Sequence, residues 1–341
     1  MKKITGIFTI LILAVLLVAC GNDNNDDADA SNNDANQDLE EFKVGYMPNY
    51  ASLNSVISSI ENNAFSEEGL DVELVEFSDG PTIIAALESG SIDAGYIGPG
   101  AHVLPVEGEA KILAFSHLGN ADEVIGNKDK GVENIEDLKG KEIAVSSGTS
   151  SETILNLTLK EAGISKDDVD LVDMDASAIV TAMNSGTVDA VAAWSPNTNT
   201  IKNELGDNAE MLSNNDRYKE EFPSIASWVV SPSYADENED TLVSFLKGLY
   251  KGMDYRIDNE EEVAKWVADT IAVDEDSVQE QTGDGSWISS EELMDLIDDG
   301  TLEEYYQTQQ DNFVESGDVE EDDAHSVKDY VLFDIMEKAA E

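Results

Sequence analysis

The chain has 341 residues, of which 73 are Asp or Glu and 19 are Lys or Arg, so its formal net charge at pH 7 is −54. This charge excludes nucleic acid as a partner, because no basic face exists that could displace the counterions of a phosphate backbone. Hydrophobic residues make up 41% of the chain, which favours a folded protein with an acidic surface, suited to a salty or alkaline exterior.

The beginning of the chain carries a signal and a tether. Lys2 and Lys3 precede an apolar run shorter than the roughly 20 residues that span a bilayer, so residues 1–19 are expected to be a signal peptide. Cys20, the only cysteine, follows Leu-Val-Ala and resembles the acylated cysteine of the bacterial lipobox. The resemblance implies a lipid anchor at the extracellular face of the cell membrane. With the acidic composition, we expect a Gram-positive, salt- or alkali-adapted bacterium. Residues 20–41 are almost free of large apolar side chains and are expected to form a disordered acidic linker.

The chain that follows alternates strands and helices. A strand is expected at 42–47, a helix at 51–68 and a second strand at 70–77. A short helix, a Ser-Gly turn and a third strand that ends near Gly98 complete this unit. Strand, helix, strand, helix, strand is the order of a right-handed parallel α/β sheet.

The same unit is written a second time. Residues 77–100 and 174–197 align with a constant offset of 96 positions, which superimposes Asp93 on Asp189. Identical pairs at this offset are Ala86 and Ala182, Ser89 and Ser185, Gly90 and Gly186, and Ala94 and Ala190. The second unit begins with an expected strand, helix and strand at 141–147, 150–162 and 169–174. The sequence therefore predicts two similar α/β lobes.

Two stretches of the sequence are expected to carry the chain between the lobes, near residues 122–131 and 225–233. After them, apolar residues at helical spacing alternate with acids, which predicts helices that cover the first lobe. The expected division places lobe 1 at 42–126 and 229–341, and lobe 2 at 127–228.

Four motifs carry a resemblance to a known family. They are VGYMP at 44–48, SGSIDAGYIGP at 89–99, IEDLKGKEIAV at 135–145 and SGTVDAVAAWSP at 185–196. With the lipobox and the acidic tether, they resemble a type II periplasmic (solute) binding protein of an ABC importer, within the nitrate-, sulfonate- and taurine-binding group. The likeness covers residues 42–341. It implies a two-lobed α/β fold, in which each lobe is a mostly parallel sheet flanked by helices and the ligand cleft lies between the lobes. It also implies ABC permease subunits as partners, a monomer, and no cofactor or metal.

Helix starts that follow strands mark the expected ligand site. Prolines at 81, 99 and 196 stand in first turns, and Thr149 begins a capping box. Free N–H groups at such helix ends attract anions, so several of them facing one cleft would hold an anion without arginine. By resemblance, the positions equivalent to the group's ligand contacts are Tyr46, Gly80, Pro81, Gly98, Pro99, Ser147, Thr149, Ser150, Trp194 and Ser195. Asn49 is expected to orient the organic end of the ligand.

The preferred ligand is a small organic anion of the sulfonate type, taurine and nitrate included. Hydroxyl groups at 146–151 would surround the three oxygens of a sulfonate. One departure from the group bears on taurine, because close sulfonate and taurine binders read Trp-Asp-Pro where this chain reads Trp194-Ser195-Pro196. The loss of that carboxylate counts against an amine-bearing ligand.

A small cationic or heteroaromatic solute, such as a pyrimidine precursor of thiamine, is the alternative ligand. Relatives within the same group bind such pyrimidines. The acidic field of the protein would attract a cation, and aromatic side chains would supply a cation–π or stacking pocket. The candidate aromatic residues are Tyr46, Tyr50, Trp194 and Trp228.

An enzyme of the same fold is a third alternative. His102, His117 and His325 are scattered without metal-ligand spacing, and the sequence has no nucleophile elbow and no phosphate loop. His102 and His117 are expected to be structural. Pyrimidine-forming relatives of the fold need reactive side chains including cysteine, whereas Cys20 is expected to carry lipid. We therefore expect a binding protein without catalytic residues.

Overall fold

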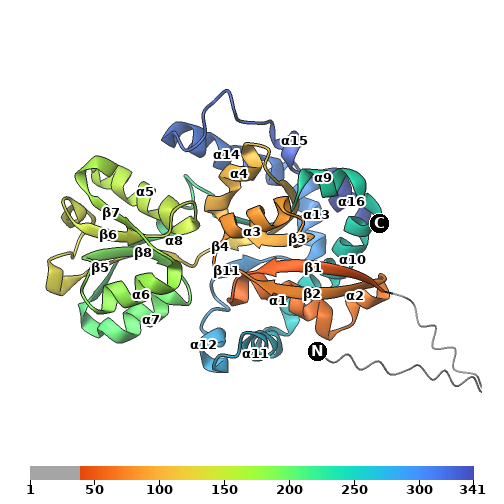
Figure 1. Cartoon of the computed structure of the whole chain (residues 1–341), viewed down its shortest axis with the longest axis horizontal. Coiled ribbons are helices and arrows are strands. Elements are labelled where there is room, and N and C mark those ends of the chain that lie inside the picture. Colours follow the sequence, from red (N-terminus) through yellow and green to blue (C-terminus); the bar gives the residue numbers. More distant parts are fainter. Residues whose placement is uncertain (1–38) are drawn as a thin grey trace, which may run out of the picture. The chain divides into compact units, whose positions relative to one another are not determined.

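The fold is seen in a computed structural model, which describes residues 39–341. Residues 1–38, with the expected signal peptide, Cys20 and most of the expected linker, lie outside the described residues. The described residues form two α/β lobes, each built on its own sheet (Figure 1). This arrangement confirms the predicted fold class. None of the helices within 39–341 combines the length and the apolar character needed to cross a membrane.

The larger sheet has six strands and is mixed. Its strands lie in the order β11 (Gly285–Trp287), β4 (Lys111–Gly119), β10 (Ile225–Val230), β3 (Ala94–Ile97), β1 (Glu40–Tyr46) and β2 (Leu70–Glu76). β1 runs parallel to β2 and β3, whereas β10 runs antiparallel to both β3 and β4. β11 adds an antiparallel edge to β4.

The smaller sheet has five strands and repeats the arrangement of the larger one. Its strands lie in the order β7 (Asp170–Asp173), β6 (Glu142–Val145), β8 (Ala190–Trp194), β5 (Asp122–Asn127) and β9 (Ala209–Asn214). β6 runs parallel to β7 and β8, and β5 runs antiparallel to β8 and β9. Each lobe therefore has three parallel strands followed by an antiparallel one.

Helices cover the faces of both sheets. Those of the larger lobe are α1 (Tyr50–Glu61), α2 (Ala64–Glu67), α3 (Gly80–Glu88), η1 (Pro99–His102), α4 (Val103–Val106), α9 (Pro232–Glu237), α10 (Glu239–Asp258), α11 (Glu260–Ile271), α12 (Glu275–Gln279), α13 (Ser290–Asp298), α14 (Thr301–Ser316), α15 (Val327–Tyr330) and α16 (Phe333–Ala340). Those of the smaller lobe are η2 (Lys128–Lys130), η3 (Ile135–Leu138), α5 (Ser150–Ala162), η4 (Lys166–Asp168), α6 (Ala176–Asn184), α7 (Asn197–Leu205), η5 (Gly206–Asn208) and α8 (Asn215–Tyr218). The helices from α9 onward pack on the larger lobe, as the sequence predicts (Figure 1).

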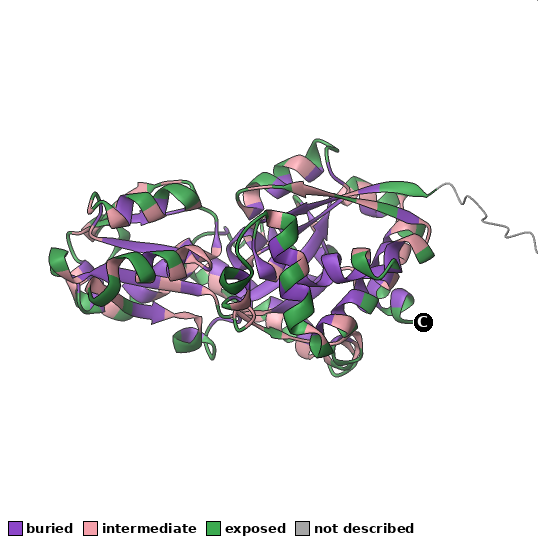
Figure 2. Ribbon diagram, turned by 90° about the horizontal axis from the view of Figure 1, so that it is seen from below, coloured by how far each residue is buried: buried purple, intermediate pink, exposed green. Residues whose placement is uncertain are grey.

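The cores follow from the alternation of side chains along the strands. In the smaller lobe, Ile143 and Val145 of β6 pack with α5 on one face of the sheet. Ala144, between them, packs with α6 and α7 on the other face. The larger lobe has one extensive core, and buried residues fill the sheets and the inward sides of the helices (Figure 2).

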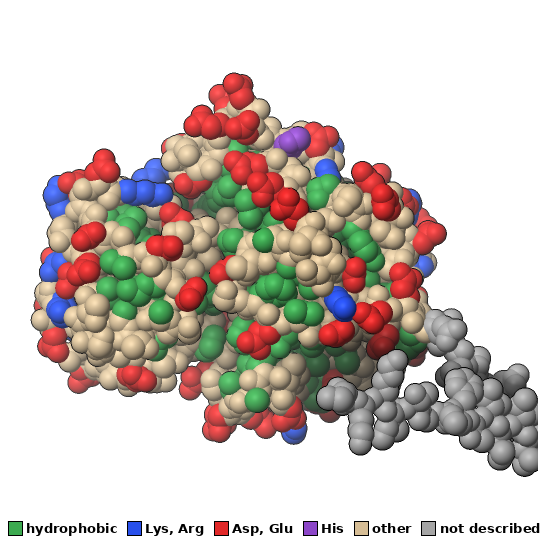
Figure 3. Space-filling view, viewed as in Figure 1, with side chains coloured by type: hydrophobic (Ala, Val, Ile, Leu, Met, Phe, Trp, Pro, Cys, Tyr) green, Lys and Arg blue, Asp and Glu red, His purple; other side chains and the backbone are tan. Residues whose placement is uncertain are grey.

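The surface carries the acidic charge of the composition. On the face shown in Figure 3, acidic side chains are spread over both lobes, with few basic ones between them. The arginine of the smaller lobe, Arg217, forms two hydrogen bonds with Glu161, at 2.6 Å and 2.5 Å. Lys202 pairs with Glu123 at 2.7 Å. The exposed Arg217 pair contributes little, about 0–1 kcal/mol, and is weakened by salt, whereas Glu123 is largely buried beside Lys202.

The chain crosses between the lobes twice, after β4 and after β9. The strand positions differ from the expected division. β5, at 122–127, belongs to the smaller sheet although residues up to 126 were expected in lobe 1, and β10 belongs to the larger sheet although it begins before 229. The reason is strand pairing. β5 is hydrogen-bonded on both edges to strands of the smaller sheet, β8 and β9, and β10 is hydrogen-bonded on both edges to strands of the larger sheet, β3 and β4.

The repeated aspartate has the same structural role in both lobes. Asp93 accepts a hydrogen bond from the backbone N–H of Lys43 at 2.7 Å, and Asp189 accepts one from that of Glu142 at 3.1 Å. Each carboxylate thus binds a backbone N–H at the sheet. α3 and α6 begin and end at positions that differ by the same 96 residues, which confirms the predicted repeat.

We expect Asp93→Ala and Asp189→Ala to lower the free energy of unfolding by about 1–2 kcal/mol each, because each leaves a strand N–H without its acceptor. Asp93→Asn and Asp189→Asn should have smaller effects, since the amide oxygen can still accept. Urea denaturation followed by circular dichroism measures the change. Asp71→Ala, at an exposed position of β2, is the control, and an effect there as large as at the two repeated positions would contradict this role.

Candidate functional site

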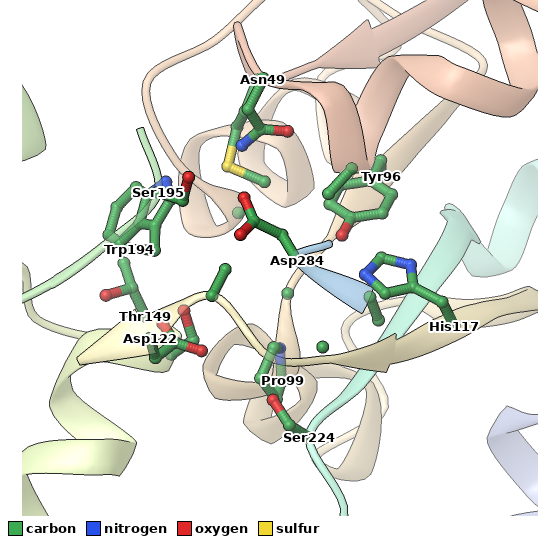
Figure 4. A pocket seen from close by; sticks show the side chains of 18 of the residues that line it. Asn49, Tyr96, Pro99, His117, Asp122, Thr149, Trp194, Ser195, Ser224 and Asp284 are labelled. Carbon is green, nitrogen blue, oxygen red and sulfur yellow. The ribbon is translucent and has the colours of Figure 1, made fainter. Parts of the chain in front are cut away.

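A cavity of about 60 Å³ lies between the lobes, where the chain leaves strands of both sheets (Figure 4). A buried water needs about 10–15 Å³ on the same measure, so the cavity has room for a few water molecules. The cavity is lined by Met47, Asn49, Ala51, Gly80, Tyr96, Gly98, Pro99, Ala101, His117, Gly119, Ala121, Asp122, Thr149, Ser150, Trp194, Ser195, Ser224, Ala226, Gln281 and Asp284.

Eight of the candidate ligand contacts come together in this lining. They are Asn49, Gly80, Gly98, Pro99, Thr149, Ser150, Trp194 and Ser195. Their segments follow β1, β2, β3, β6 and β8, so the carboxyl ends of parallel strands meet at the cavity, as is usual for α/β sheets. Their contact with a ligand stays a prediction.

Tyr46, Pro81 and Ser147 lie outside the lining. The Tyr46 hydroxyl donates to Glu76 at 3.3 Å, and the backbone N–H of Ser147 donates to Asp173 at 2.9 Å. The Pro81 ring lies against Gly148 of the smaller lobe. Each of these residues stands within two positions of a lining residue in sequence, but its own groups contact other parts of the protein.

Two helix starts are fixed by hydrogen bonds beside the cavity. Asn49 caps α1 by accepting from the backbone N–H of Ser52 at 2.9 Å, and Gln281 accepts from that of Tyr50 at 3.0 Å. Thr149, at the start of α5, donates its hydroxyl to the carbonyl oxygen of Ser146 at 2.7 Å. These bonds hold the polar lining in place.

The two lobes touch closely beside the cavity. A side chain added at Gly100 of η1 would lie 2.1 Å from the carbonyl carbon of Thr149 in the smaller lobe, so only glycine allows this approach. On the same side of the molecule, Lys160 and Lys166 pair with Glu315 and Asp318 at 3.2 Å and 3.7 Å. The two lobes are therefore in contact beside the cavity.

Six polar residues of the lining were not among the candidate ligand contacts from the sequence. They are Tyr96, His117, Asp122, Ser224, Gln281 and Asp284. Most of them lie near a crossing or in the C-terminal region, where tertiary packing decides their position. Asp284 alone had a local signal, because it stands between Gly283 and Gly285, an exposed turn pattern within a helical region.

Two of these residues are acids with unusual proton affinity. Burial raises the pKa of Asp122 to about 6; Ser150 and Asn215 oppose the rise, and Asp284 and Glu123 add to it. Burial also raises the pKa of Asp284 to about 6, against the opposing effect of Ser195. The carboxylates therefore carry charge at neutral pH at an energetic cost.

His117 is a buried, neutral wall of the cavity. Burial, and then the nearby Arg256 guanidinium, lower its pKa well below the usual value. Its ring is stacked with Tyr96 at 6.1 Å and lies 4.5 Å from the ring of Trp287. Burial likewise lowers the pKa of His102 to about 4, and this ring bonds to the Gly98 carbonyl and the Ser227 hydroxyl. His102 does not line the cavity, in agreement with its expected structural role.

Both arginines of the chain have structural partners. Arg256 is buried, with one end of its guanidinium bonded to Asn54 and the other to the carbonyl oxygens of Ser116 and Ile288 at 3.2 Å. No lysine or arginine appears in the lining. Within 39–341, no three His, Cys, Asp or Glu side chains are grouped to hold a metal ion.

A model of the family described as NMT1/THI5 like matches residues 55–263. The chain belongs to this family. Its relatives include a binding protein of Brucella abortus, 33% identical over 86% of this chain and 90% of the relative. A Bacillus subtilis protein named as an aliphatic sulfonates-binding protein is 26% identical over 82% of this chain and 81% of the relative. The taurine-binding periplasmic protein of Escherichia coli is 26% identical over 56% of this chain and 59% of the relative.

Solved structures show the same fold as this NMT1/THI5-like protein. The alkanesulfonate-binding protein SsuA from Xanthomonas axonopodis pv. citri, bound to MOPS, superimposes with a TM-score of 0.69 at 18% identity, covering 86% of this chain and 98% of SsuA. The nitrate-binding protein NrtA from Synechocystis PCC 6803 gives 0.70 at 14%, covering 89% and 88%. The desulfurization enzyme DSZB gives 0.60 at 14%, covering 88% and 99%, so the fold also serves an enzyme.

We expect Asp122→Asn to stabilise this NMT1/THI5-like protein at alkaline pH. The pKa of Asp122 is about 6 in the fold and about 3.9 in an unfolded chain. Stability therefore falls as pH rises from about 4 to 6, where only the folded state keeps the proton, and the loss persists above pH 6. The variant should exceed the wild type by about 3 kcal/mol at pH 8 and match it near pH 4.

Urea unfolding at five pH values from 4 to 8 measures this difference. Asp137→Asn is the control with the opposite sign, because backbone N–H groups of Glu133 and Asn134 lower the pKa of Asp137. That substitution should destabilise the protein more at pH 8 than at pH 4. A benefit of Asp122→Asn that is the same at every pH would contradict the assigned cost of ionisation.

Proposed function

We propose that the chain is the substrate-binding protein of an ABC importer, which closes its two lobes over a small solute and delivers it to the permease subunits. The observation that carries the proposal is a small cavity whose lining comes from both lobes. Binding of a solute there favours the closed form by contacting both lobes at once. The names of the sequence relatives, which are binding proteins, support a role in binding without catalysis.

The proposal leaves two solute classes to compare. A sulfonate-type anion, taurine or nitrate is supported by the names of the relatives. The start of α5 adds to this support, because Thr149 makes no side-chain cap bond to the first N–H groups of the helix. A cationic or heteroaromatic solute is supported by Trp194 and Tyr96, which bring aromatic rings to the lining beside the acids.

The protein is further proposed to act as a monomer at the outer face of the cell membrane, held by lipid on Cys20 and the linker 20–41. The support is the sequence at Cys20 and, for an extracytoplasmic location, the periplasmic name of the Escherichia coli relative. An acidic surface remains soluble in a salty exterior, because ions screen its self-repulsion.

We expect Cys20→Ala to abolish incorporation of a labelled fatty acid and to release the protein from membranes into the medium. The reason is that the thiol is the only group of the chain that the lipobox reaction modifies. Detergent phase partitioning and fatty-acid labelling measure the outcome. A variant that partitions with the detergent as the wild type does would contradict the anchor.

We expect ligand binding to reduce the radius of gyration and to change tryptophan fluorescence, because Trp194 lines the cavity. Calorimetry with alkanesulfonates, taurine, nitrate, hydroxymethylpyrimidine and betaine selects the ligand, and small-angle scattering then measures closure. Trp194→Ala should remove most of the fluorescence change. Trp266→Phe, on α11 and outside the lining, should keep it. Binding with an unchanged radius of gyration would contradict lobe closure.

A further inference from the structure

Asp122 presents an unpaired oxygen to the cavity from the smaller lobe. It is the first residue of β5, and its side chain and backbone are both held by Asn215. Oδ2 accepts from the Asn215 amide at 3.2 Å, whereas Oδ1 has no partner at hydrogen-bond distance and angle among the described residues, although the Ser150 hydroxyl lies near enough to lower the pKa of this carboxyl. Only 4% of the residue is exposed. A buried carboxylate oxygen without a partner costs free energy unless a donor reaches it.

Asp284 presents a second carboxylate from the larger lobe. It precedes β11, and its backbone is fixed by bonds from its N–H to the Gln281 carbonyl at 3.0 Å and from the Asn120 N–H to its own carbonyl at 2.7 Å. Figure 4 shows its carboxylate in the middle of the lining, between Trp194 and Tyr96. The Ser195 hydroxyl lies close enough to oppose the rise of its pKa.

The charge of this pair is not balanced by the lining itself. Lysine and arginine are missing from the lining, and Arg256 and Arg217 are bonded elsewhere. Lys202, the base that most affects Asp284, is paired with Glu123. His117 is neutral. A bare anion placed here would meet two carboxylates. The starts of α1 and α3 are capped by the side chains of Asn49 and Asp79, and the start of α5, which has no side-chain cap and is worth about 1 kcal/mol, would not offset that repulsion.

We infer that the solute carries an ammonium or another positively charged N–H group, which binds between Asp122 and Asp284 and so joins the two lobes. The inference rests on the proposed function, because it assigns a solute class to the same cavity. The N–H group donates a hydrogen bond to the free Oδ1 of Asp122. Its positive charge lies between the carboxylates of Asp122 and Asp284 and offsets their repulsion. The aromatic rings of Trp194 and Tyr96 line the same part of the cavity and would interact favourably with the cation.

Asp284 also supplies the carboxylate that is missing from the sequence at position 195. Position 195 has serine where the sulfonate and taurine binders resembled by this chain have aspartate. The side chain of Ser195 lies beside Asp284, so the larger lobe supplies a carboxylate at the place where the smaller lobe lacks one. An aminosulfonate therefore fits the assignment, with its sulfonate away from the acids.

The test compares ligands that differ only in the charged group. The pairs are taurine with isethionate, and benzylamine with benzyl alcohol, titrated by calorimetry at pH 8, where both acids are ionised. In at least one pair the amine should bind at least tenfold more tightly than its hydroxyl partner. Equal binding of the two members in both pairs, measurable or not, overturns the inference.

Variants of the two acids make the test specific to the cavity. Asp284→Asn and Asp122→Asn should each weaken amine binding at least tenfold and leave the hydroxyl compounds within threefold. Asp236→Asn, an exposed acid outside the lining, controls for the loss of one charge and should change neither. Unchanged amine binding in both cavity variants overturns the assignment.

The same samples separate this inference from the proposed function. Amine binding that depends on both acids but leaves the radius of gyration unchanged supports the assigned solute class and contradicts the proposed closure. Closure driven by both hydroxyl compounds as strongly as by their amine partners supports the binding protein and overturns the solute class. Thermal melting of each variant shows that it is folded before it is titrated.

Discussion

The cavity depends on the two chain crossings, which are bonded to each other. The backbone N–H of Gly119, in the first crossing, donates to the carbonyl oxygen of Ser224, in the second, at 2.7 Å. Asn215 joins them again, because its amide donates to Asp122 and to the Ser224 hydroxyl at 3.2 Å each. With the crossings fixed side by side, the carboxyl ends of the parallel strands of both sheets face one point, and every polar residue of the lining follows from that placement.

Electrostatics divides into a surface part and a cavity part. On the surface, acids are spread apart, and salt screens them at small cost. In the cavity, Asp122 is buried and Asp284 is partly buried, burial raises the pKa of each, and Asp284 adds to the rise of the Asp122 pKa. The net charge of −54 therefore does not predict the charge of the ligand, whereas the carboxylates of Asp122 and Asp284 favour a positively charged group.

The repeat made half of the molecule predictable from the sequence. The Ser-Gly turns, the aspartates at 93 and 189 and the prolines after strands are local signals, and they located the helix starts that line the cavity. Trp194 was placed at the cavity by its repeat partner Gly98, and both line it. Side chains whose direction depends on tertiary contacts could not be predicted in this way. Tyr46 is an example, because its hydroxyl donates a hydrogen bond to Glu76 and does not line the cavity.

The two acids of the cavity, Asp122 and Asp284, were not predicted from the sequence for a related reason. Asp122 follows the first crossing, and the sequence placed its strand in the wrong lobe because strand pairing cannot be read from one segment alone. Asp284 comes from the C-terminal region, more than 150 residues from Asp122, and its place is set by how that region packs on the larger lobe. Local patterns specify elements, while the contacts between distant elements decide which side chains meet.

β5 and β10, the antiparallel strands that follow the two chain crossings, have a consequence for the order of folding. All strands of the smaller sheet come from one continuous stretch, 122–214, whereas β10 fills the gap between β3 and β4 only after that stretch has been made. Until then β3 and β4 expose unpaired edges, which invite wrong pairing. We therefore expect the smaller lobe to fold first and the larger lobe to close around β10 last, an order that pulse-labelled hydrogen exchange during refolding would show as early protection of 122–214.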